Sequence, residues 1–155
     1  MHRIMFVCHG NICRSPMAEF VMRDLAMKAG RANEFRIASS ATSTEEIGNP
    51  VHPGTKRVLS AHGIGCVGKT ARQLRRDEYK SWDLFVVMDD ANVRNIGRIL
   101  GKDPDAKVHK LLEFADGYEP STRARDVADP WYTGDFEATW RDVLAGCEGL
   151  LARLK

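Results

Sequence analysis

Short apolar runs alternate along this chain with stretches whose apolar residues recur at helical spacing. Strands separated by helices pair in parallel, because each helix carries the chain back across the sheet. We therefore expect an α/β protein: a three-layer sandwich in which a four-stranded parallel sheet carries helices on both faces, in the doubly wound or flavodoxin-like manner. The predicted strands are Arg3 to Val7, Phe35 to Ser39, Leu84 to Met88 and Lys107 to Leu111.

Helical patterns fill the intervals between these strands. One helix is closed by Gly30, a second covers Thr55 to His62 and is closed by Gly63, and a third covers Asp90 to Leu100. With 155 residues the chain fits one domain, 1–155. Two of the helices carry an apolar face, the first formed by Met17, Val21, Met22, Leu25 and Ala29, and the last formed by Phe136, Trp140, Val143, Leu144, Cys147 and Leu151.

The composition excludes several classes of protein. Hydrophobic residues make up 43% of the chain and the net charge is +2, so we expect neither nucleic acid nor a membrane surface as a partner. Apolar stretches are too short for a membrane span or a secretory signal, which favours a cytoplasmic protein. Four scattered cysteines do not make a disulfide scaffold, and they lack the spacing of a metal site.

A motif that contains a cysteine, a glycine and an arginine follows the first predicted strand. Ser15 is a good helix N-cap and Pro16 the preferred first helical residue, so the segment reads as a loop on a helix N-terminus. Backbone N–H groups and the helix dipole make such a loop an anion site, and Arg14 adds a fork of donors suited to phosphate. The same field favours the nucleophilic thiolate of Cys8. The whole segment reads Val7-Cys8-His9-Gly10-Asn11-Ile12-Cys13-Arg14-Ser15-Pro16.

This segment resembles the active-site loop of the low-molecular-weight protein tyrosine phosphatases, whose pattern is C-x-G-N-x-C-R-S-P. The resemblance implies a phosphomonoesterase without metal or cofactor that acts on phosphotyrosine in proteins, and on small aryl phosphates, through a cysteinyl-phosphate intermediate. It implies that residues 8–15 bind phosphate, with Cys8 as nucleophile and Arg14 as clamp, and we expect a monomer or weak dimer. Other segments match in the family's order: Ser39-Ser40-Ala41, Ile47-Gly48-Asn49-Pro50, His62-Gly63-Ile64, Ala71-Arg72-Gln73, Met88-Asp89 and Asp129-Pro130-Trp131-Tyr132.

Expulsion of the substrate oxygen requires a proton from a positioned acid. Asp129 is a candidate because Pro130 forces it out of helical conformation, and the neighbouring aromatic residues favour a protonated carboxyl. An Asp-Pro pair alone is often only a turn, as at Asp103-Pro104. The resemblance selects Asp129 as the general acid, and as the general base for hydrolysis of the intermediate.

Further residues are expected to support the loop. Asn11 tolerates a left-handed backbone, and Ser15 can cap the helix and donate toward the sulfur of Cys8. The resemblance implies that Asn11, Ser15 and Ser39 form a network that holds the loop in shape. Cys13 is a candidate partner for a reversible protective disulfide with Cys8, the alternative being a packed thiol.

The expected substrate slot departs from the family pattern. Glu45 stands where the family often places an aromatic residue, which predicts an open acidic wall opposite Trp131 and Tyr132. Ile12 favours phosphotyrosine over phosphoarginine, because related arginine phosphatases carry Thr at that place. The family's histidine before Ala-Arg-Gln is missing from Gly68-Lys69-Thr70, which predicts a thinner network beneath the loop.

Three alternative functions make different demands on the sequence. Gly63 to Thr70 matches the G-x-x-x-x-G-K-T expression of an NTPase, with Leu84 to Asp89 as its metal-binding strand, but a helix rather than a strand is predicted before Gly63. Arsenate reduction on the same scaffold needs a relay of cysteines, for which only Cys66 and Cys147 remain. A silent phosphopeptide-binding module is disfavoured because nucleophile, clamp and acid are all present.

Overall fold

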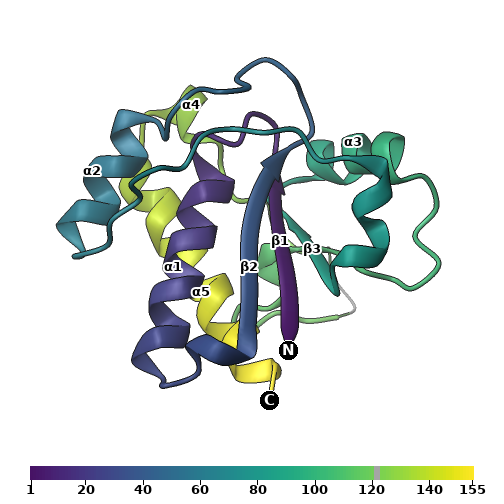
Figure 1. Cartoon of the computed structure of the whole chain (residues 1–155). Helices are drawn as coiled ribbons and strands as arrows, with labels where there is room; N and C mark the ends of the chain where they lie inside the picture. Colours follow the sequence, from purple (N-terminus) through teal and green to yellow (C-terminus); the bar gives the residue numbers. More distant parts are fainter. Residues whose placement is uncertain (121–122) are drawn as a thin grey trace.

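The structure, a computed structural model, describes residues 1–120 and 123–155. Within these ranges four strands form one parallel sheet in the order β2-β1-β3-β4 (Figure 1). The predicted α/β fold and its sheet are confirmed, with β1 at the centre and the chain winding outward from it in both directions. The strands are β1 (His2–Cys8), β2 (Phe35–Ala41), β3 (Leu84–Val87) and β4 (Val108–Lys110).

Helices cover both faces of the sheet (Figure 1). Alternate residues of β1 point to opposite faces, so Ile4 and Phe6 enter one core while Met5 and Val7 enter the other. The first core is closed by α1 (Arg14–Lys28), α2 (Pro53–Ala61) and α5 (Phe136–Arg153), and the second by α3 (Asp90–Leu100) and the 3-10 helix η2 (Arg76–Ser81). The remaining short elements are η1 (Ala32–Glu34), η3 (Leu111–Glu113) and α4 (Pro130–Thr133).

The two predicted glycine stops are confirmed. Gly30 and Gly63 have φ of 71° and 76°, a left-handed conformation that glycine adopts without a steric penalty. After each glycine the next residue closes the helix end, through Arg31 N to Ala26 O at 2.8 Å and Ile64 N to Leu59 O at 2.9 Å. These hydrogen bonds satisfy carbonyl groups that the helix itself leaves free.

The predicted start of the first helix was wrong by two residues. Helix α1 begins at Arg14, its N-cap is Cys13, and Ser15 lies inside the first turn with no capping role. Its hydroxyl is instead 3.0 Å from the sulfur of Cys8. Pro16 is tolerated there because first-turn N–H groups have no helical partner. The helix therefore starts within the loop that it supports.

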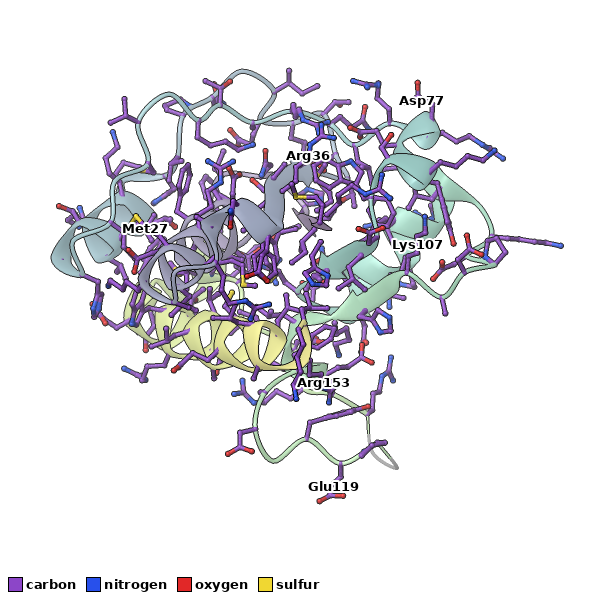
Figure 2. All side chains as sticks on the ribbon, turned by 60° about the horizontal axis from the view of Figure 1, so that its bottom comes forward. Met27, Arg36, Asp77, Lys107, Glu119 and Arg153 are labelled. Carbon is purple, nitrogen blue, oxygen red and sulfur yellow. The ribbon has the colours of Figure 1, made fainter. Side chains whose placement is uncertain are left out.

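Charged side chains lie around the outside of this core, as the labelled Asp77, Lys107 and Glu119 illustrate in Figure 2. In the described ranges, we find no helix that combines the length and apolar character needed to cross a bilayer.

Two glycines provide a test of how tightly the layers pack. A methyl group at Gly149 in α5 would lie 1.7 Å from the carbonyl oxygen of Phe114, whereas one at exposed Gly97 in α3 would meet nothing within 4 Å. We expect Gly149→Ala to destabilise the protein by about 1–3 kcal/mol through overpacking, and Gly97→Ala to stabilise it by roughly 0.5–1 kcal/mol through helix propensity. Urea unfolding of both variants measures these changes, and equal effects would contradict the packing of α5.

Candidate active site

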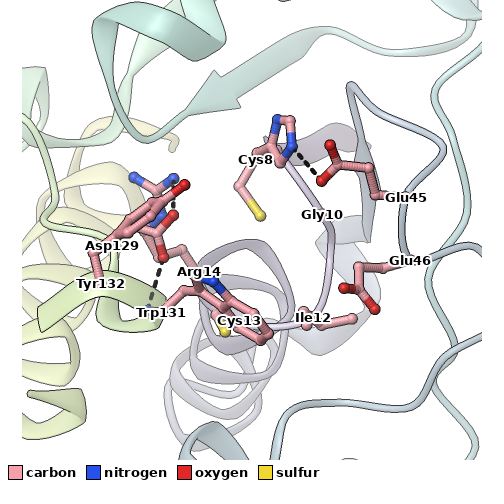
Figure 3. A pocket seen from close by; sticks show the side chains of 11 residues that line it. Cys8, Gly10, Ile12, Cys13, Arg14, Glu45, Glu46, Asp129, Trp131 and Tyr132 are labelled. Carbon is pink, nitrogen blue, oxygen red and sulfur yellow. Dashed lines mark hydrogen bonds and ion pairs between the residues drawn. The ribbon is translucent and has the colours of Figure 1, made fainter. Parts of the chain in front are cut away.

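A pocket of about 380 Å³ lies at the carboxyl end of β1 (Figure 3). This is the edge at which doubly wound sheets bind ligands. The structure therefore brings together residues from three distant segments that the sequence analysis had selected separately. The lining residues are Cys8, His9, Gly10, Ile12, Cys13, Arg14, Glu45, Glu46, Asp129, Trp131 and Tyr132.

Cys8 ends β1 beneath this pocket, and its side chain points into it in Figure 3. Two groups of Ser15 meet the sulfur: the hydroxyl oxygen at 3.0 Å and the backbone N–H, which donates across 3.4 Å. Both are donors available to a thiolate, and hydrogen bonds to a charged form favour that form. The N-terminus of α1 adds the positive end of the helix dipole next to the loop.

Asn11 holds the loop in its unusual shape. Its φ is 60°, the left-handed conformation that the sequence analysis predicted, and its side chain is buried. Its amide nitrogen donates to Ser15 Oγ at 2.7 Å and to Ser39 Oγ at 3.0 Å, while its amide oxygen accepts from Arg72 N at 3.3 Å. The three predicted support residues are thus joined in one network.

Arg14 is almost completely buried, with 2% of its surface exposed. Its Nη1 donates to Asp89 Oδ2 at 2.7 Å and to the Val127 carbonyl at 2.8 Å, and its Nη2 lies 3.4 Å from Asp129 Oδ2. Burial disfavours the charged guanidinium, but the charges of Cys8, Asp129 and Asp89 raise the pKa of Arg14 above its ordinary value. The guanidinium is therefore a fixed positive charge at the pocket.

Asp129 is extended, as its position before a proline predicted, with φ of −81° and ψ of 113°. Its Oδ1 accepts the backbone N–H of Trp131 at 3.0 Å and so caps the short helix α4, which the sequence analysis did not predict. Its Oδ2 faces Arg14. Figure 3 shows the carboxyl group on the pocket wall, on the same side as Arg14.

The short helix α4, which Asp129 caps, carries two aromatic residues that form one wall of the pocket. Trp131 and Tyr132 are 58% and 84% exposed, unusual values for large aromatic side chains. The ring of His52 contacts Trp131 edge-on at 5.8 Å and stacks on Phe136 at 5.0 Å between ring centroids. Trp131 is therefore supported from behind while its ring borders the pocket.

The opposite wall is polar, as Glu45 led us to expect. Glu45 lines the pocket with a largely exposed side chain, and its Oε2 lies 2.8 Å from His9 Nε2. This contact within the polar wall was not predicted. Glu46, which sequence reasoning also missed, lies against Gly10. A methyl group added at Gly10 would lie 3.3 Å from the Cγ atom of Glu46.

The other cysteines differ from Cys8 in their surroundings. Burial, reinforced by the nearby charge of Cys8, raises the pKa of Cys13 to about 12, so this thiol stays protonated at neutral pH. Burial also raises the pKa of Cys66 and of Cys147, and neither of them lines the pocket. No relay of cysteines for arsenate reduction therefore reaches this pocket from the described residues.

The nucleotide-binding alternative is wrong. Gly63 closes helix α2 instead of following a strand, and the next helical residues after Thr70 begin only at Arg76, in a 3-10 helix. A phosphate-binding loop of that kind requires a strand before it and an α-helix directly after it. Asp89, the residue that would have held the metal, is bonded to Arg14 and caps α3.

Sequence reasoning missed three residues that complete the site from below. Asp89 anchors Arg14, while Glu19 and Lys69 join the network beneath the loop through Ser39. Glu19 could have been found from the helical spacing, because Ser15 and Glu19 are four residues apart on one face of α1. Lys69 comes from the segment that lacks the family's histidine, and it contacts this network at the Ser39 carbonyl, while the expected thinning of the network stays a prediction.

Comparisons with known proteins show similarity to one family over nearly the whole chain. Residues 3–155 match the family described as low molecular weight phosphotyrosine protein phosphatase. The low molecular weight protein-tyrosine-phosphatase YfkJ of Bacillus subtilis is 37% identical over 155 residues, covering 100% of this chain and 97% of that protein. The low molecular weight phosphotyrosine protein phosphatase of Gallus gallus is 36% identical, with 97% and 94% covered.

Solved structures show the same similarity in three dimensions. The crystal structure of YfkJ superimposes with a TM-score of 0.92 at 38% identity and covers 99% of this chain and 94% of the other. That of the low molecular weight protein tyrosine phosphatase SP-PTP from Streptococcus pyogenes gives 0.85 at 38% identity, covering 100% and 94%. The chain therefore belongs to the low molecular weight protein-tyrosine phosphatases, a family of hydrolases.

Proposed function

We propose that residues 1–155 form one phosphatase domain that hydrolyses phosphotyrosine in proteins, and small aryl phosphates, through a cysteinyl-phosphate intermediate without a metal. The observation that carries this proposal is the position of Cys8 between the N-terminus of α1 and the buried charge of Arg14. A dianionic phosphate bound there would meet loop N–H groups, the helix dipole and the guanidinium.

The first step transfers the phosphoryl group to the enzyme. The Cys8 thiolate attacks phosphorus, an S–P bond forms, and the bond between phosphorus and the phenolic oxygen breaks. Protonated Asp129 donates its proton to the leaving oxygen, so that phenol rather than phenolate departs. The position of Asp129 next to Arg14, on the pocket wall, supports this role.

The second step restores the enzyme. Asp129, now a carboxylate, takes a proton from a water molecule as the water oxygen attacks phosphorus. The S–P bond breaks, inorganic phosphate leaves and the thiolate is regenerated. Arg14 and the loop would stabilise the charge on the equatorial oxygens in both steps, which is the main requirement of phosphoryl transfer.

The slot above the phosphate is expected to hold the tyrosine ring. Trp131 and Ile12 offer apolar surface, Tyr132 extends the same wall outward, and the pair of His9 and Glu45 offers a polar one. Such a slot would contact an aryl ring on one side only. A protein substrate could then add contacts at the polar side.

Two further expectations concern the setting in which the enzyme works. The four cysteines are free thiols, which suits a reducing cytoplasmic location. Cys13 lines the same pocket as Cys8. The reversible disulfide between the two cysteines stays a prediction.

Substitution of Cys8→Ser tests the nucleophile. We expect turnover of phenyl phosphate in EDTA to fall more than about a thousandfold, because a hydroxyl in the same loop is not ionised at neutral pH. Binding of inorganic phosphate, measured by calorimetry, should persist because the loop and Arg14 are intact. Cys66→Ser, outside the pocket, is the matched control. Residual hydrolysis near the wild-type rate would refute the assignment.

Substitution of Asp129→Ala tests the proton donor. We expect kcat for phenyl phosphate to fall roughly 100- to 10,000-fold, and to fall far less for an aryl phosphate whose leaving group needs no proton, such as dinitrophenyl phosphate. Steady-state kinetics with both substrates measure the ratio, with Asp105→Ala on an exposed loop as the control. Equal losses for both leaving groups would argue against an acid role.

Substitution of Glu45→Tyr tests the polar wall. A second ring beside the slot should lower KM for phenyl phosphate roughly two- to tenfold through ring stacking, with kcat little changed. Glu45→Gln removes the same charge without adding a ring and should leave KM near the wild-type value. If the two variants give the same KM, Glu45 does not border the bound ring.

A further inference from the structure

Lys69 lies beneath the phosphate-binding loop, in the segment between α2 and η2. Its Nζ donates to the carbonyl oxygen of Ser39 at 2.8 Å and lies 3.8 Å from Glu19 Oε1. Only 13% of its side chain is exposed, a low value for a lysine on a connecting segment. The ammonium group is therefore placed between β2 and α1, out of the pocket itself.

The backbone around Lys69 is fixed from both sides. The next residue, Thr70, pairs with Pro50, and Gln73 pairs with Ala41 at the end of β2. Between these two bridges the backbone N–H of Arg72 donates a hydrogen bond to Asn11 Oδ1. Lys69 is thus held against the strand that carries Ser39.

The hydrogen bonds that start at Glu19 have a defined direction. A carboxylate only accepts, so the Ser39 hydroxyl donates its single proton to Glu19 Oε1 across 2.5 Å. Ser39 Oγ is then an acceptor for the amide of Asn11 at 3.0 Å. The amide orientation of Asn11 is fixed independently, because its oxygen accepts from Arg72 N.

The same direction continues to the nucleophile. Ser15 Oγ accepts from the amide of Asn11 at 2.7 Å, which leaves its one hydroxyl proton to donate elsewhere. Two acceptors are then within reach: the carbonyl oxygen of Ser40 at 3.5 Å and the sulfur of Cys8 at 3.0 Å, which as a thiol donates to this oxygen and as a thiolate accepts from it. A proton directed to the sulfur stabilises the thiolate.

We propose that Lys69 is a positioning residue for the Cys8 thiolate: by pairing with Glu19 and holding Ser39 in place, it sets the direction of the hydrogen bonds that end on the sulfur. This rests on the proposed function of Cys8 as nucleophile. Lys69 acts through Ser39, Asn11 and Ser15 and does not touch the substrate.

The charges around Lys69 are consistent with this role. Glu19 and Arg23 face it from α1 and Arg72 from its own segment, and burial lowers the pKa of Lys69 while Glu19 opposes the change. The Arg72 side chain is engaged by Glu78 at 2.9 Å, and Arg23 is half exposed. Of the two cations on Glu19, Arg23 is the nearer, with Nη2 2.7 Å from Oε2, whereas Lys69 lies 3.8 Å from Oε1 and is the better buried. Cys8 interacts electrostatically with Arg14, which no Lys69 variant alters, and with Lys69 itself, so Glu19→Gln is the variant that separates a direct charge effect from the chain of hydrogen bonds.

The test follows the ionisation of Cys8 directly. The rate of Cys8 alkylation by iodoacetate is measured from pH 4 to 9, alongside kcat/KM for phenyl phosphate over the same range, with mass spectrometry to locate the label. For Lys69→Gln we expect both pH midpoints to move upward by roughly half a unit, because the direct attraction of the cation and its hold on Ser39 are both lost, with the plateau at high pH retained. Lys69→Arg keeps the cation and should restore the wild-type midpoints.

Two further variants keep the result interpretable. Lys102→Gln removes the same charge from an exposed loop and should leave both profiles unchanged. Glu19→Gln interrupts the same chain at its acceptor end, and should raise the midpoints as Lys69→Gln does. The proposal would be overturned by unchanged midpoints in both variants with only a lower melting temperature. It would also be overturned if Lys69→Gln raised the midpoints while Glu19→Gln lowered them, as direct charge effects would.

Failure of this inference is distinguishable from failure of the proposed function. The alkylation profile reports on the sulfur without any turnover, so it can be read in an enzyme of any activity. Wild-type protein without aryl phosphatase activity would refute the function, whereas a normal wild type with unaltered Lys69 variants would refute only the role of Lys69.

Discussion

The buried guanidinium of Arg14 is the interaction on which the rest of the site depends. A charge with 2% exposure is tolerated only when it is paired, and its partners come from the N-cap of α3, the chain at Val127 and the N-cap of α4. Removing a partner from a buried pair typically costs about 3–5 kcal/mol. The same contacts that offset the burial of Arg14 therefore bring three segments, distant in sequence, to one end of β1.

Asp89 and Asp129 each pair with Arg14 while capping a helix. Each caps a helix with one carboxylate oxygen, Oδ1 to Asn92 N in α3 and Oδ1 to Trp131 N in α4, and turns the other oxygen toward Arg14. Capping fixes the orientation of a carboxylate without using its second oxygen. Local helix geometry thus determines where the charges around Arg14 stand, and α4 then carries Trp131 to the pocket mouth.

The sequence was sufficient to predict the features that depend on local patterns. The strands follow from apolar runs, the helix stops from Gly30 and Gly63, and the loop from Cys8 to Ser15 from its motif. It was insufficient where distant segments decide the outcome. Helix α1 begins at Arg14 because the Ser15 hydroxyl is drawn to Cys8 and Asn11 and does not cap the helix. Lys69 carries no pattern of its own, since its pairing with Glu19 exists only once the segment after α2 crosses β2.

Burial separates the nucleophile and the side chains that hold it from the residues proposed for recognition, with Asp129 in between at 25% side-chain exposure. Cys8, Asn11, Arg14 and Ser15 are buried and joined by hydrogen bonds, so a change at any one disturbs its neighbours. The rim residues Glu45, Trp131 and Tyr132 are exposed and belong to connecting segments or to the short α4. Substitutions on such positions change contacts with little effect on the fold. The polar wall at Glu45 can therefore differ from the family pattern while the phosphate-binding loop keeps its shape.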